Sequence, residues 1–188
     1  MSNTEGYLLF SRTYYVRRSA SAFLFYLAVT VLSSVVGYLY FLLFGADGSF
    51  AIVDQSKRAA DLLDGQILSV IEASVLFVAV YTVCFRWIAA FLCVFRGICL
   101  GISIGVYAGC SLLGASGGFA WALVAYFLSS VIFLALASVS HIYSEVVCAT
   151  YVSEESRNMR PLTIEYTKLF FIISGVFFIL GCITVALI

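Results

Sequence analysis

Two charged residues, Glu72 and Arg96, lie inside stretches of the chain that are otherwise apolar. A charge at bilayer depth costs at least ~2.5–3.5 kcal/mol on insertion scales, so it usually faces a partner or a watery cavity. At ~1.5 Å per residue from the short connection at Arg86, Glu72 lies about 20 Å along one helix and Arg96 about 15 Å along the next. A long arginine side chain covers that difference, so we expect an intramembrane charge pair.

This pair has three candidate roles. A buried ion pair could fix the register of two neighbouring helices, or the two charges could relay protons or bind a substrate. Alternatively, the apolar stretch around Arg96-Gly97 could be broken, which would place Arg96 in a re-entrant turn.

Four glycines recur at intervals of four residues: Gly97, Gly101, Gly105 and Gly109. On a helix this spacing places them along one face, where the missing side chains let another backbone approach closely. We expect this face to pack either against a neighbouring helix of the same chain or against the helix of a docked partner protein.

The remaining reactive side chains do not form a recognisable catalytic or metal site. The one histidine, His141, lies near Glu145, but Tyr143 and Cys148 do not complete a metal-ligand set. We expect His141 to be an interfacial polar residue, with pH sensing as the alternative. The six cysteines form no CxxC pair and lie in or beside apolar stretches, which favours neither a zinc site nor a disulfide framework.

Nucleotide-binding, zinc-protease and serine-hydrolase motifs are also missing from the sequence. We therefore expect a protein that is not an enzyme and needs no cofactor. The net charge of zero provides no basic field, which disfavours nucleic acid as a partner.

The composition indicates which elements hold these residues. Of the 188 residues, 63% are hydrophobic and 11% charged, whereas a soluble domain has about 25% charged residues. So few charges cannot cover a water-soluble surface. We predict an all-α, polytopic integral membrane protein in which residues 1–188 form a single helical domain.

Five stretches approach the roughly 20 apolar residues that a transmembrane helix needs. The predicted spans are residues 19–44, 66–85, 87–113, 119–140 and 169–188. An odd number of spans places the two termini on opposite sides. The first apolar run is longer than the roughly 7–15 residues of a signal-peptide core, so we expect it to remain as an anchor.

Lysine and arginine predict the orientation, because they accumulate in cytoplasmic loops. Seven of them fall on one predicted side: Arg12, Arg17, Arg18, Arg86, Arg157, Arg160 and Lys168. The other side has only Lys57 and Arg58, in an acidic loop. We expect a multi-pass cell-membrane protein with a cytoplasmic N-terminus and an extracytoplasmic C-terminus. Aromatic residues near the span ends are expected in the interfacial belts: Tyr14, Tyr15, Trp87, Trp121, Tyr143, Tyr151 and Tyr166.

Two connections have distinctive patterns. Residues 45–65 mix apolar and charged side chains, which fits either a short helix on the membrane surface or a plain solvated connector. Residues 141–168 form the longest predicted cytoplasmic loop, with a helix end and a turn within 153–161.

The residues around Arg96 resemble the [KR]-G-x-x-L-G-x-x-x-G element of the stage II sporulation protein M family, whose members are small bacterial membrane proteins with about five spans. The matching positions are Arg96, Gly97, Leu100, Gly101 and Gly105. The resemblance implies a role in sporulation, at engulfment of the forespore. The best-known members resemble non-enzymatic scaffolds that hold two peptidoglycan-degrading enzymes, a lytic transglycosylase and an amidase, at the septal membrane.

This resemblance covers about a dozen residues, and the N-terminal region shows no family signature. The family also includes members from organisms that do not form spores. For the matching residues it implies a role in folding or partner contact and no catalytic role.

Two functions follow from these patterns. The first is a membrane scaffold that docks partners along the glycine face and through residues 45–65. The alternative is a membrane subunit of a transporter, in which Glu72 and Arg96 act on the substrate and an ATPase docks at residues 141–168. Expected partners are membrane lipids, other membrane or envelope proteins, further copies of this chain and, by resemblance, peptidoglycan hydrolases.

Overall fold

A computed structural model describes residues 4–44, 68–112, 117–152 and 160–186, with side chains described for 17–44, 68–109, 121, 123–148 and 163–179. These residues form helices and one short turn at 80–84, and no strand occurs within the described ranges. The helices are α1 (Thr4–Phe44), a short helix Leu68–Ala79, α3 (Phe85–Leu112), α4 (Gly117–Val152) and α5 (Arg160–Ala186). The all-α prediction is therefore confirmed.

Three of the helices contain segments that are long and apolar enough to cross a membrane: Arg17–Phe44, Phe85–Gly109 and Leu123–Cys148. Leu68–Ala79 is apolar but shorter than the predicted span 66–85, because the chain turns directly after Ala79. The structure thus indicates a membrane protein, and the count of five spans stays a prediction.

Two helices extend well beyond their predicted spans. α1 begins at Thr4 instead of residue 19, and α4 continues to Val152 instead of ending near residue 140. Neither glycine nor proline occurs in residues 7–36 or 119–152, so nothing in these stretches breaks a helix. A change from apolar to polar residues marks where a helix leaves the membrane, and the helix itself can continue.

The prediction of one long loop over residues 141–168 is therefore wrong. Residues 141–152 continue α4, and α5 already begins at Arg160, with Pro161 in its first turn, where a missing N–H is tolerated. Residues 153–159, within the predicted helix end and turn, lie outside the described residues. The same holds for the predicted surface helix or connector at 45–65.

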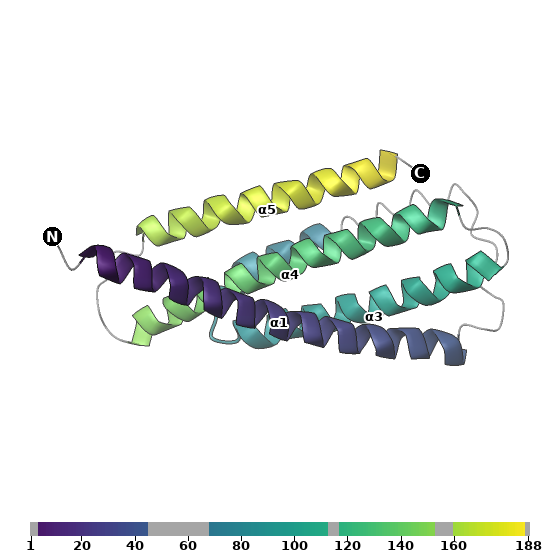
Figure 1. Ribbon diagram of the computed structural model, residues 1–188, viewed down its shortest axis with the longest axis horizontal. Coiled ribbons are helices and arrows are strands. Elements are labelled where there is room, and N and C mark those ends of the chain that lie inside the picture. The colour runs from purple at the N-terminus through teal and green to yellow at the C-terminus, as the bar shows by residue number, and fades with distance from the viewer. Residues whose placement is uncertain (1–3, 45–67, 113–116, 153–159, 187–188) are drawn as a thin grey trace.

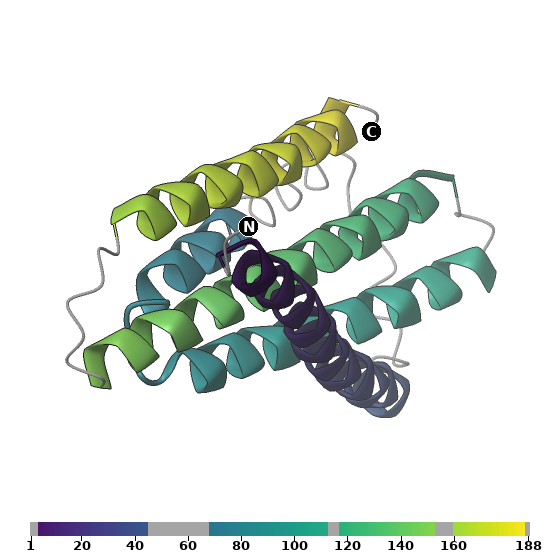
Figure 2. The same cartoon turned by 60° about the vertical axis from the view of Figure 1, so that its left-hand side comes forward.

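The helices form an elongated bundle, with the start of α1 and the end of α5 toward opposite ends of its long axis (Figure 1). α1 packs on α3 and also contacts α4, while α5 packs on α4. The helix Leu68–Ala79 lies between α4 and α5, as both views show (Figures 1 and 2). In the second view α1 crosses the other helices obliquely (Figure 2).

The buried side of α3 shows how the sequence positions the central residues. Phe85, Ala89, Cys93, Arg96 and Leu100 are all buried, at intervals of three or four residues that place them on one face. Many large apolar side chains of all these helices are exposed, as expected for helices in contact with lipid.

Candidate functional site

Arg96 is the largest fully buried side chain among the described residues, with 1% of its surface exposed. Its Nη1 donates a hydrogen bond to Glu72 Oε2 at 2.5 Å, and its Nε donates to Ser130 Oγ at 3.2 Å. Its Nη2 donates to Ser129 Oγ. We call Arg96, Glu72, Ser129 and Ser130 the arginine centre, in which every guanidinium nitrogen has a partner.

The arginine centre joins three helices. Arg96 comes from α3, the two serines from α4, and Glu72, itself 5% exposed, from the helix Leu68–Ala79. Ser130 donates its own hydroxyl proton to the Tyr126 carbonyl at 2.8 Å. Its oxygen lone pairs are therefore available to accept from Arg96.

Three aromatic rings surround the guanidinium. The Arg96 Cζ atom lies 4.7 Å from the ring centre of Phe133, 5.2 Å from that of Phe177 and 5.6 Å from that of Tyr126. A guanidinium over aromatic faces is attracted by their quadrupoles, more strongly where water is absent. Because Phe177 belongs to α5, the contacts of Arg96 extend to a fourth helix.

The structure thus brings Glu72 and Arg96 into contact. The third alternative, a break near Arg96-Gly97, is wrong because α3 continues as one helix from Phe85 to Leu112. Ser129 and Ser130 were not among the residues expected at this site. Two adjacent hydroxyls in the middle of an apolar span were the available signal, since polar groups at that depth need partners.

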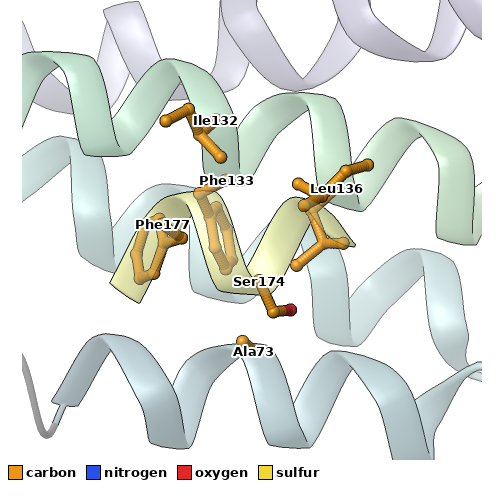
Figure 3. Close-up of a pocket in the computed structure, with 7 residues that line it drawn as sticks. Ala73, Ile132, Phe133, Leu136, Ser174 and Phe177 are labelled. Carbon is orange, nitrogen blue, oxygen red and sulfur yellow. The ribbon is translucent and has the colours of Figure 1, made fainter. Parts of the chain in front are cut away.

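A small cavity adjoins the arginine centre. Its volume is about 10 Å³, enough for about one water molecule and far below the roughly 300–1,000 Å³ of ligand pockets. Side chains from Leu68–Ala79, α4 and α5 line it (Figure 3): Ala73, Ile132, Phe133, Leu136, Ile173, Ser174 and Phe177. The Ser174 hydroxyl is buried there without a hydrogen-bond partner.

The glycine face of α3 lies against α1. A Cβ atom at Gly97 would lie 2.5 Å from the Thr30 carbonyl oxygen, and one at Gly101 would lie 2.7 Å from the Tyr38 backbone nitrogen. Real Cβ contacts essentially never fall below 3.0 Å. The main chains of α1 and α3 are therefore in direct contact here. This part of the glycine face is occupied by α1 of the same chain.

The outer half of the glycine face is less constrained. A Cβ atom at Gly105 would overlap the ring of Phe41 and would lie 2.9 Å from the Cβ atom of Phe41. At Gly109 the nearest atom is Phe41 Cζ at 3.8 Å, an ordinary contact. The need for glycine thus weakens toward the end of α3.

His141 belongs to a second polar group near the opposite end of α3. Its Nδ1 lies 3.0 Å from the Tyr26 hydroxyl, and its Nε2 lies 3.4 Å from Glu145 Oε1. Arg18 holds Glu145 with two nitrogens, Nε at 2.7 Å from Oε2 and Nη2 at 3.0 Å from Oε1. No three His, Cys, Asp or Glu side chains gather as metal ligands in the part of the chain that the structure describes.

Two of the predicted interfacial aromatics are buried instead. Tyr143 and Tyr166 stack with ring centres 4.2 Å apart, and their exposed fractions are only 5% and 4%. Their hydroxyls reach Thr163 at 2.7 Å and Ser140 at 3.0 Å, respectively. This stack joins α4 to α5, whereas Trp87 and Trp121 are exposed.

No family model, curated protein or solved structure matches this chain. The relation to the stage II sporulation protein M family stays a prediction that depends on the residues around Arg96.

Proposed function

We infer that this protein is a non-enzymatic, multi-pass membrane scaffold whose arginine centre fixes the helices relative to one another. One observation carries this inference: all three nitrogens of the Arg96 guanidinium are bonded within the chain, and three rings surround it. A proton relay or substrate site needs groups that can exchange partners or contact water. An arginine that is 1% exposed suits a structural role better.

The partners of such a scaffold would dock on its outer surface. α1 occupies the inner part of the glycine face, so lateral contacts pass to outward apolar side chains such as Leu32 and Leu43 on α1 and Phe171 on α5. Envelope-remodelling proteins, including peptidoglycan-degrading enzymes at engulfment, are the partners that the sequence resemblance supplies. Residues 45–65 would contribute contacts outside the membrane.

The proposed orientation places the N-terminus in the cytoplasm and the C-terminus outside. Outside the arginine centre, the described charged side chains are Arg17, Arg18, Arg86, Glu145, Glu165 and Lys168. Arg18 bonds to Glu145, and Arg86 lies over Phe25. The excess of basic over acidic side chains in this set supports a cytoplasmic location for the segments that carry them.

The test is affinity purification of the tagged full-length chain from its own cells, after crosslinking and in mild detergent. The matched variant is the neutral double substitution Glu72→Gln with Arg96→Met, since a buried pair can be replaced as a unit with little loss of stability. A scaffold should recover the same envelope proteins from both chains. Recovery of an ATPase or a solute-binding protein, with loss of transport in the folded double variant, would instead establish the transporter alternative.

A further inference from the structure

Arg86, in the first turn of α3, is an exposed cation. Its Cζ atom lies 5.1 Å from the ring centre of Phe25 on α1. Among the residues with described side chains, no carboxylate lies within ion-pair distance of Arg86. Stacking on Phe25 holds the planar guanidinium while its N–H groups remain available for a ligand.

The carboxylate of Glu145 is engaged by other residues. Glu145 receives two nitrogens of Arg18 and one of His141. The positive charge of Arg86 is therefore not neutralised by this group. A guanidinium that no described carboxylate neutralises attracts anions, and its planar fork matches the geometry of a phosphate.

An apolar stripe on α3 begins at the residue that follows Arg86. Trp87 is 79% exposed and Phe91 70% exposed, and Phe95 lies one further turn along. Intervals of four residues place these rings on one outward face. Tryptophan favours the headgroup level of a bilayer, where its apolar ring and polar N–H both find suitable surroundings.

We propose that Arg86 and Trp87 form a binding site for an anionic phospholipid. The guanidinium binds the lipid phosphate through paired N–H···O bonds, Trp87 lies at the headgroup, and an acyl chain lies along Phe91 and Phe95. A zwitterionic lipid binds more weakly, because its headgroup also carries a cation. The site depends on the membrane placement of α1 and α3 and is independent of the scaffold function.

The test is native mass spectrometry of the full-length chain in mild detergent, titrated with phosphatidylglycerol and, separately, with phosphatidylcholine. We expect preferential retention of phosphatidylglycerol and a loss of about tenfold in its affinity in Arg86→Gln, the size of one charge-assisted hydrogen bond. Lys168→Gln is the matched control. It removes one exposed cation from α5, which packs on α4.

Three results would overturn the proposal: equal retention of the two lipids, equal affinities in the Arg86→Gln and Lys168→Gln variants, or displacement of the lipid by inorganic phosphate. The last would identify a site for free phosphate. If Arg86→Gln does not accumulate in the membrane, Arg86→Lys replaces it, since that variant keeps the charge and loses the fork and the ring stacking. Wild-type affinity in Arg86→Lys would contradict the proposed geometry.

Discussion

Gly37 on α1 lies against the backbone of Ile98 on α3, so that a Cβ atom at position 37 would sit 2.9 Å from the Ile98 Cα atom. Gly97 and Gly101 make the reciprocal approach from α3 to the backbone of α1. Each helix thus places glycine where the other helix has main chain. This arrangement permits close packing between helices in lipid, where the hydrophobic effect does not drive association.

We expect Gly101→Ala to destabilise the protein by about 1–3 kcal/mol, the usual cost of overpacking. The added methyl group would meet the Ser34 carbonyl and the Tyr38 nitrogen, which are backbone atoms and cannot move unless the helices separate. The measurement is the apparent Tm of the purified chain in detergent. Gly175→Ala on α5 is the control, because a Cβ atom at position 175 would have no atom within 4 Å apart from the backbone of its own helix. Equal melting of the two variants would show that α1 and α3 are not in close contact.

Removing one member of the buried charge pair should cost more than removing both. Glu72→Gln leaves Arg96 buried without its counter-ion, and we expect a loss of about 3–5 kcal/mol. Adding Arg96→Met to this variant should restore much of the stability, because no buried charge then remains. The free energies of unfolding of the wild type, Glu72→Gln, Arg96→Met and the double variant would provide the coupling energy. Additive losses would mean that the two side chains act independently.

The contact between Glu72 and Arg96 could be predicted, because the two residues lie on consecutive antiparallel segments joined by a short turn. The helical class and the bounds of α3 followed from the length and apolarity of the segments. These properties depend only on local sequence. The full extent of α1 and α4 was missed because polar residues end a membrane span without ending a helix.

Other features of the site depend on how the helices are rotated and paired, which spacing alone does not encode. The four-residue glycine interval identifies a packing face but not the helix that packs on it, which is α1. In the same way, Ser129 and Ser130 reach Arg96 only because α4 turns that face toward α3. Tyr143 and Tyr166 were assigned to interfacial belts because their pairing across α4 and α5 is a tertiary contact.

Ser174→Ala should stabilise the protein. Its hydroxyl is buried beside an apolar cavity without a hydrogen-bond partner, and such a group costs about 1–3 kcal/mol. Removing it should raise the apparent Tm. Ser138→Ala is the matched control, since the hydroxyl of Ser138 is also buried but donates to the Ala135 carbonyl at 2.8 Å. A lower Tm for Ser174→Ala than for the wild type would indicate that the hydroxyl has a partner, such as a bound water molecule.

The attachment of α5 to α4 should depend more on ring stacking than on the Tyr166 hydroxyl. Tyr166→Phe removes the hydrogen bond to Ser140 and keeps the ring against Tyr143, so we expect a loss of about 1 kcal/mol. Tyr166→Ala also removes the ring, which stacks on Tyr143 and lies parallel to Phe77 at 6.0 Å, and should cost about 3–5 kcal/mol. Limited proteolysis and thermal unfolding would separate the two variants, with early cleavage expected near α5 in Tyr166→Ala only. Equal losses in both variants would mean that the hydroxyl contact, and not the stack, holds the helices together.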